Sequence, residues 1–169
     1  LADLELPEDG VILDIGAGLG FFLSSISNEW EKFALEPSDF GKKFIKNNYK
    51  EIKILSSSIN DIKNKDNYFD VIMFYHVIEH LEDPSTALQS IYKLLKKDGI
   101  LIVGTPNCRS IASLLFRGKY RLLTQEHLCL FNPKSLRNIL EKNNFEVIKE
   151  EYPFFKSDYF NFRNILRLF

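Results

Sequence analysis

Short apolar runs alternate with segments of helical periodicity along most of the chain. The runs are almost continuously apolar, as expected for strands that are buried on both faces of a parallel sheet. They cover residues 11–15, 32–36, 52–55, 70–75, 100–103 and 145–149. Segments with helical spacing lie between them, at residues 21–28, 39–48, 84–97 and 133–142. This alternation predicts a doubly wound, Rossmann-like α/β fold, with a mostly parallel sheet and helices on both faces. Without a repeat or linker, we expect a single domain over residues 1–169.

Capping residues mark the expected helix ends. Ser38 or Asp39 can cap the helix over residues 39–48, and Asp83 followed by Pro84 is a favourable start for the next helix. Asn132 followed by Pro133 predicts the start of the last helix. The pair Asn143–Asn144 tolerates the left-handed conformation that ends a helix.

A glycine-rich loop follows the first expected strand, and an acidic residue follows the second. The loop is Asp14–Ile15–Gly16–Ala17–Gly18–Leu19–Gly20, and the acid is Glu36. In doubly wound folds, ligands bind beyond the carboxyl ends of the strands, and a carboxylate after the second strand can accept hydrogen bonds from ribose hydroxyls. The third glycine comes one residue too early for the dinucleotide fingerprint, and Phe21 follows it, which disfavours a nicotinamide cofactor. The alternative is a tight turn without a ligand.

Composition narrows the class of protein. The chain has 169 residues, of which 45% are hydrophobic and 27% charged, with a net charge of -1, so no strong positive field draws it to nucleic acid. No apolar run approaches the roughly 20 residues of a transmembrane segment, and residues 1–10 are acidic and lack the basic start that is typical of a signal peptide. Two cysteines without a spacing signature fit a reduced compartment. We therefore expect a cytoplasmic protein without a nucleic-acid partner.

Four segments resemble the motifs of class I S-adenosylmethionine (SAM)-dependent methyltransferases. Residues 11–20 look like the first motif, residues 33–38 like the second, residues 69–81 like the fourth, and residues 94–101 like the segment before the fifth strand. The resemblance is closest to the broad group that includes the ubiquinone-biosynthesis O-methyltransferases. It implies a SAM-dependent methyltransferase that acts on a small-molecule acceptor, with O-methylation as the expected reaction. The alternative is a non-catalytic SAM-binding or scaffold domain.

The resemblance also implies roles for particular residues. The backbone of Gly16 to Gly18 would line the methionine part of SAM, and Asp14 would orient that loop or reach the amino group through water. Glu36 would hold the ribose, and Ser58 stands where relatives place an acid that contacts the adenine amino group. The full expected set of cofactor-binding residues is Asp14, Gly16, Ala17, Gly18, Gly20, Glu36, Pro37, Ser58, Ile59, Tyr75 and His76.

All three histidines follow expected strands, and an imidazole can accept a proton near neutral pH. We predict His127 and His76 as the catalytic residues, while a loop histidine without a catalytic role is the alternative for His127. On one helical turn, His76, Glu79 and His80 would share a face, with ligand types that suit zinc. The preferred interpretation is that no metal binds, and that Glu79 and His80 bond the backbone and shape the pocket.

Two further segments have several interpretations. The loop over residues 110–124 contains Arg117, Lys119 and Arg121, which either attract an anionic acceptor or form a solvated face. The aromatic tail over residues 152–169 could form a lid, a homodimer contact or a membrane-surface helix, or pack on the sheet.

Overall fold

The computed structural model describes residues 8–109 and 127–151. The chain divides into two compact units. The first consists of Leu1–Ile78 and Asp83–Gly104, and the second of Glu79–Glu82 and Thr105–Phe169.

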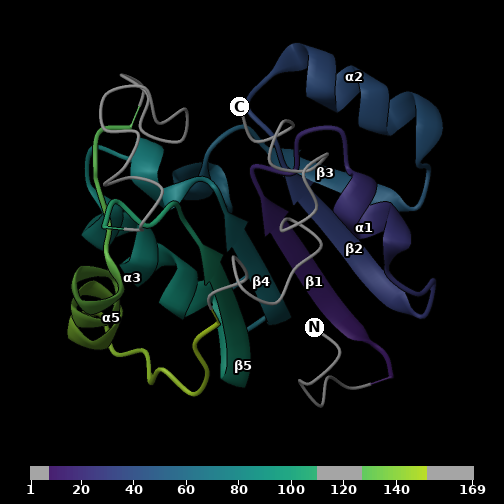
Figure 1. Ribbon diagram of the computed structural model, residues 1–169. Coiled ribbons are helices and arrows are strands. Elements are labelled where there is room, and N and C mark those ends of the chain that lie inside the picture. Colours follow the sequence, from purple (N-terminus) through teal and green to yellow (C-terminus); the bar gives the residue numbers. More distant parts are fainter. Residues whose placement is uncertain (1–7, 110–126, 152–169) are drawn as a thin grey trace. The chain divides into compact units, whose positions relative to one another are not determined.

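A five-stranded sheet with the order β3-β2-β1-β4-β5 forms the first unit (Figure 1). Its strands are β1 (Gly10–Ile15), β2 (Trp30–Leu35), β3 (Ile52–Ser56), β4 (Phe69–Tyr75) and β5 (Leu95–Gly104). All neighbouring strands are parallel. The chain runs outward from β1 to β3 and then returns to β4 on the other side of β1, so the strand order reverses between β1 and β4. Ligands bind at such a switch point, beyond the carboxyl ends of the strands.

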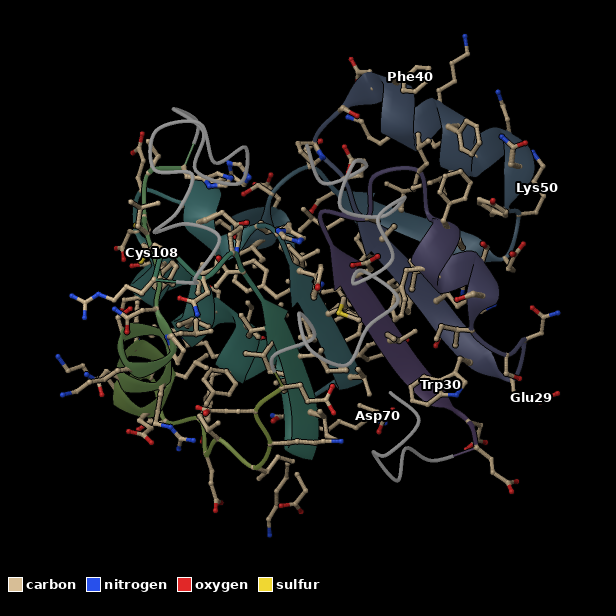
Figure 2. The ribbon with its side chains drawn as sticks, in the orientation of Figure 1. Glu29, Trp30, Phe40, Lys50, Asp70 and Cys108 are labelled. Atoms are coloured by element: carbon tan, nitrogen blue, oxygen red, sulfur yellow. The ribbon has the colours of Figure 1, made fainter. Side chains whose placement is uncertain are left out.

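Three helices connect these strands, namely α1 (Phe21–Ser25), α2 (Asp39–Asn48) and α3 (Pro84–Leu94). Leu23 of α1 and Ile45 of α2 are fully buried in one apolar cluster with residues on one face of the sheet. Those sheet residues are Ile12, Trp30, Ala34, Ile52 and Val71. Neighbouring residues along each strand point to the opposite face, where the right-handed connection from β4 to β5 places α3. On α2, Phe40 points away from the sheet, and just after the helix the Lys50 amine donates to the Lys46 carbonyl at 2.6 Å (Figure 2).

The predicted caps of α2 and α3 are confirmed. The Ser38 hydroxyl accepts a hydrogen bond from the Gly41 N–H at 3.0 Å. The Asp83 carboxylate accepts one from the Thr86 N–H at 3.1 Å, and Pro84 occupies the first turn of α3. Each side chain satisfies one of the N–H groups that a helix leaves unpaired at its start.

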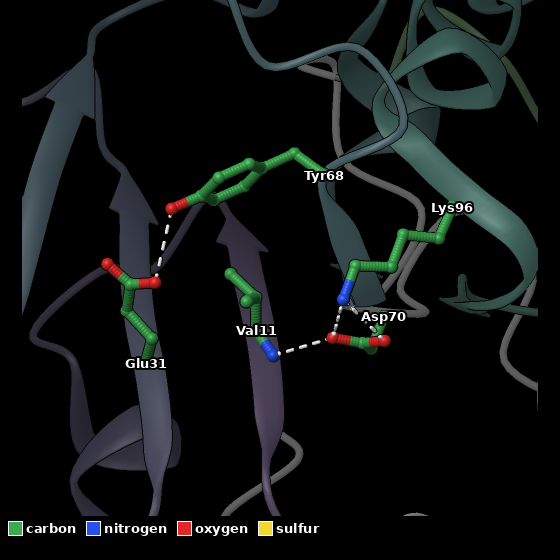
Figure 3. A network of polar contacts seen from close by, with 5 residues as sticks. All are labelled: Val11, Glu31, Tyr68, Asp70 and Lys96. Atoms are coloured by element: carbon green, nitrogen blue, oxygen red, sulfur yellow. Dashed lines mark hydrogen bonds and ion pairs between the residues drawn. The ribbon is translucent and has the colours of Figure 1, made fainter.

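Polar contacts join the strands near their amino ends (Figure 3). The Asp70 carboxylate accepts a hydrogen bond from the Val11 N–H at 2.8 Å and pairs with the Lys96 amine at 2.8 Å. The Tyr68 hydroxyl donates to Glu31 at 3.1 Å. These contacts tie β1, β4 and β5 together at the edge opposite the switch point, so we assign them a structural role.

The described part of the second unit contains helix α5 (Pro133–Lys142). Asn132 caps it and forms a reciprocal pair of hydrogen bonds with Ser135, as the sequence predicts for the start of this helix. Asn144 has a φ of 67°, which confirms the left-handed end. Before the helix, Asn107 and Phe131 form an isolated parallel bridge.

Two expected helices are shorter than predicted. The first ends at Ser25 rather than residue 28, and the Ser24 and Ser25 hydroxyls bond to carbonyls three residues earlier. Such bonds compete with continuation of the helix. Helix α3 ends at Leu94 because Leu95 is extended and pairs with Phe69 of β4, so β5 begins before the expected turn at Asp98.

The sixth strand that the sequence predicts at residues 145–149 is not formed in the described part of the chain. The segment is apolar enough for a strand, but it forms no ladder with any described strand. A strand requires a hydrogen-bonding neighbour, and apolar spacing alone does not supply one. Over the described ranges, no helix combines the length and the apolar character that a membrane crossing requires.

Candidate functional site

The glycine loop after β1 is held against the end of β2. The N–H groups of Gly16 and Ala17 both donate to the Leu35 carbonyl, at 2.8 and 3.2 Å. Gly16, Gly18 and Gly20 all have positive φ angles, which side chains other than glycine rarely adopt. The loop therefore needs glycine for its backbone conformation.

Glu36 connects this loop to the start of α2. Its buried carboxylate accepts hydrogen bonds from the Gly18 N–H at 2.7 Å and from the Ser38 N–H at 2.8 Å, one on each oxygen. These bonds fix the carboxylate at the carboxyl end of β2. Each carboxylate oxygen has a second lone pair, so Glu36 can still accept hydrogen bonds from a ligand's hydroxyl groups.

Gly41 is a site residue that the sequence analysis missed. A methyl group at this position would lie 2.6 Å from the Gly18 carbonyl oxygen, 2.8 Å from Cγ of Glu36 and 2.9 Å from the Ser38 hydroxyl. The first turn of α2 thus packs directly on the glycine loop and on Glu36. The available signal was a glycine inside a segment with helical periodicity, which often indicates a close backbone approach or a cap.

Asp14 is the second buried carboxyl at this edge, with 6% of its surface exposed. Burial, as the larger cause, and the negative charge of Glu36 together raise the pKa of Asp14 to about 7. Asp14 therefore holds a proton over much of the range in which an ordinary aspartate is ionised.

The other predicted cofactor residues lie at or just beyond the carboxyl ends of their strands. Pro37 is exposed between Glu36 and α2. Ser58 caps the short 3-10 turn η1 (Ile59–Asp61) and accepts a hydrogen bond from the Asn60 N–H at 3.4 Å, and Ile59 begins that turn. Tyr75 is the last residue of β4, and its side chain is half exposed. These residues therefore lie at the edge of the sheet where the sequence analysis expects the cofactor.

His76 continues from β4 in a left-handed conformation, with a φ of 55°. Its N–H donates to the Gly104 carbonyl at 2.8 Å, and its ring meets that of Tyr75 edge-on, with 4.6 Å between the ring centroids. The helical turn that follows, η2, covers only Ile78–His80. The sequence spacing would place His76, Glu79 and His80 on one helical turn. In the structure, His76 lies outside the turn that contains Glu79 and His80.

The second unit instead brings Glu79 and His80 together with His127. One potential ligand atom from each of the three residues lies within 4.8 Å of the others. The His80 and His127 rings are 4.7 Å apart and nearly perpendicular. Glu79 is buried and accepts a hydrogen bond from the Thr105 hydroxyl at 3.1 Å. His76 is not part of this cluster among the described residues.

The structure does not describe the two segments for which the sequence analysis left several interpretations open. Arg117, Lys119 and Arg121, and the aromatic tail over residues 152–169, lie outside the described residues.

A parallel sheet with this strand order, a glycine loop after β1 and a fixed acid after β2 define the Rossmann-like class of cofactor-binding α/β proteins. The sequence model of the methyltransferase domain family matches residues 1–150, so the chain belongs to that family. Its fold is that of class I SAM-dependent methyltransferases, which confirms the fold class and the resemblance that the sequence predicted.

Individual relatives agree with this assignment. A ubiquinone biosynthesis O-methyltransferase of Rickettsia bellii is 28% identical over 87% of this chain, which spans 63% of that relative's length. A tRNA U34 carboxymethyltransferase of Ruthia magnifica is 28% identical over 84% of the chain and 47% of its own length. A crystal structure from Thermotoga maritima, described as a SAM-dependent methyltransferase and possible histamine N-methyltransferase, has a TM-score of 0.69 and 26% identity, covering 85% of this chain and 67% of its own.

Proposed function

We propose that this chain is a SAM-dependent methyltransferase domain that methylates an oxygen atom of a small-molecule acceptor. The observation that carries the proposal is the position of Glu36, fixed by the Gly18 and Ser38 N–H groups beside the glycine loop. We further propose that both compact units belong to one methyltransferase domain, because the family match runs through residue 150.

The cofactor would lie along the carboxyl ends of β1, β2 and β4. In this arrangement the second lone pairs of Glu36 accept the two ribose hydroxyls, and the exposed backbone of Gly16 and Gly18 lies against the methionine part. Asp14 lies at the end of β1, where a carboxyl can interact with the cofactor's amino group. Ser58 and Ile59 after β3 would border the adenine, as the position of η1 favours.

SAM supplies a methyl group on a positively charged sulfur, so the protein mainly has to align the acceptor oxygen and remove its proton. His76 and His127 are the candidates for accepting that proton, because neutral imidazole is a base near neutral pH. Support for an oxygen acceptor comes from the name of the Rickettsia bellii relative, at 28% identity. The Ruthia magnifica relative is named for tRNA, but a net charge of -1 on this chain favours a small molecule.

The test of the cofactor is calorimetry with SAM, its demethylated product and NAD on the wild-type protein and on Glu36→Ala. We expect SAM to bind and NAD not to bind. Loss of two hydrogen bonds to a charged group, each contributing about 1.5–3 kcal/mol, should weaken SAM binding in Glu36→Ala by at least about 100-fold. Glu29→Ala, at the exposed opposite end of β2, is the matched control and should bind SAM normally. Tight binding of NAD without SAM would refute the proposal.

Transfer itself is tested with methyl-labelled SAM across phenols, sugars and nucleotide sugars, with tRNA as a further acceptor. Labelled product from a hydroxyl compound supports the proposal, and replacement of His76 or His127 by Ala then separates the two candidate bases. SAM binding without transfer to any acceptor would favour the non-catalytic alternative. Labelling of tRNA alone would contradict the small-molecule acceptor.

A further inference from the structure

We propose that Glu79, His80 and His127 bind one divalent transition-metal ion, and that zinc fits this site best. The three residues come from two chain segments of the same compact unit, one directly after β4 and the other immediately before the α5 region. The site does not depend on the proposed methyl transfer, because its ligands and its test concern the metal alone.

The three side chains are close enough to share an ion. Their potential ligand atoms lie within 4.8 Å of one another. Zinc bonded at about 2.0–2.1 Å in tetrahedral geometry holds its ligands roughly 3.4 Å apart. Small side-chain rotations therefore bring one carboxylate oxygen and two imidazole nitrogens to bonding distance.

The kinds of ligand select the class of metal. Two imidazoles and one carboxylate are a donor set that zinc uses with three protein ligands and a fourth position for water or substrate. Imidazole also suits cobalt and nickel, whereas magnesium and calcium prefer oxygen ligands throughout. The cluster thus favours a transition metal over the alkaline-earth ions.

The backbone and a neighbouring hydroxyl hold the ligands in place without a metal. The Cys129 N–H donates to the Glu79 carbonyl at 3.0 Å, and the Cys129 thiol donates to the Leu81 carbonyl at 3.5 Å. These bonds keep the segment of His127 beside that of Glu79. The Thr105 hydroxyl donates to one carboxylate oxygen of Glu79 at 3.1 Å, which orients the carboxylate as an outer partner of a metal ligand does.

His127 supplies a second, independent observation. Its Nδ1 atom is buried and has no hydrogen-bond partner among the residues that the structure describes. A buried polar atom without a partner is unfavourable, and a metal ion bound at this nitrogen would remove that cost. As a metal ligand, His127 would not accept a proton during the reaction, and among the histidines that role would fall to His76.

The test is a titration of chelator-treated protein with zinc by calorimetry and with cobalt by visible absorption, in the absence of SAM. We expect one ion per chain and a cobalt spectrum of tetrahedral type. His127→Ala and His80→Ala should each weaken binding by more than about 100-fold, the upper limit for loss of an outer partner. Thr105→Ala should weaken it by about 10–100-fold. Magnesium should not compete with zinc.

His76→Ala is the matched control and should bind zinc as the wild type does, because His76 lies outside the cluster. His80 is exposed, so His80→Ala keeps the test valid if a substitution at the more enclosed His127 disturbs folding. Absence of stoichiometric zinc binding by the wild type would overturn the proposal. Unchanged zinc binding by a folded His80→Ala variant, or loss of binding in His76→Ala, would overturn the assignment of the ligands.

Discussion

Replacement of Asp14 by Asn tests whether this buried carboxyl at the end of β1 titrates near neutral pH. The neighbouring Glu36 carboxylate accepts a backbone N–H group on each oxygen. Asp14 has a pKa raised to about 7, first because burial penalises its charged form and second because Glu36 is negative. The substitution removes the titration and keeps nearly the same shape.

The sign and size of the effect follow from linkage. The ordinary pKa of the aspartate, 3.8, applies to the unfolded chain, and about 7 applies to the folded one. Between these values the folded protein holds a proton that the unfolded chain has lost, so protonation of Asp14 stabilises the fold. That contribution is complete below the unfolded pKa and is lost as the pH rises through the folded pKa. From about pH 5 to about pH 8 the loss amounts to about 2.5 kcal/mol.

Urea unfolding of the wild type and of Asp14→Asn at several pH values measures this difference. We expect the free energy of unfolding of the wild type, relative to that of Asp14→Asn, to fall by about 2.5 kcal/mol from about pH 5 to about pH 8. Titrating groups that do not interact with Asp14 cancel in the comparison. The control is Asp61→Asn, at an exposed aspartate, whose difference from the wild type should stay nearly constant. A constant difference for Asp14→Asn as well would refute the reasoning.

Three further substitutions have expectations that follow from single contacts. Gly41→Ala should weaken SAM binding by at least about tenfold, because its methyl group would displace the Gly18 carbonyl, which would lie 2.6 Å away. Calorimetry on the folded variant measures this, and wild-type affinity would show that the contact relaxes without effect. Asp70→Ala should cost about 1–3 kcal/mol because the Val11 N–H loses its partner, whereas Lys96→Ala should cost about 0–1 kcal/mol because the ion pair is partly exposed. Urea unfolding compares the two, and equal losses would contradict this ranking.

Most of the fold could be predicted from the sequence because its signals are local. A continuous apolar run indicates a buried strand whatever lies elsewhere in the chain, and Asp83 before Pro84 marks a helix start by itself. The strand predicted at residues 145–149 is not formed in the described part of the chain, because strand formation depends on a partner elsewhere in the chain. A strand exists only with a hydrogen-bonding neighbour, and the apolar pattern of one segment carries no information about that neighbour.

The parts of the candidate cofactor site that directly follow a strand could be predicted from the sequence. The glycine loop and Glu36 each follow a strand directly, so strand order alone places them at the same edge. Gly41 was missed because its role arises from the approach of α2 to the loop, which no local pattern describes. Likewise, helical spacing grouped His76 with Glu79 and His80, whereas the left-handed backbone at His76 and the approach of His127 decide the cluster.

The two carboxyls at the end of β1 and β2 also show how one edge can serve both binding and proton balance. The Glu36 carboxylate accepts backbone N–H groups on both oxygens, so a ligand meets an acceptor of fixed orientation there. Asp14 avoids the cost of a buried negative charge by holding a proton until about pH 7. A cofactor that carries positive charge, as SAM does on its sulfur and amino group, lowers the free energy of the ionised form of Asp14. The pH dependence of SAM binding near neutrality should therefore be smaller in Asp14→Asn than in the wild type and unchanged in the exposed control, because the buried carboxyl couples proton release to the arrival of that charge.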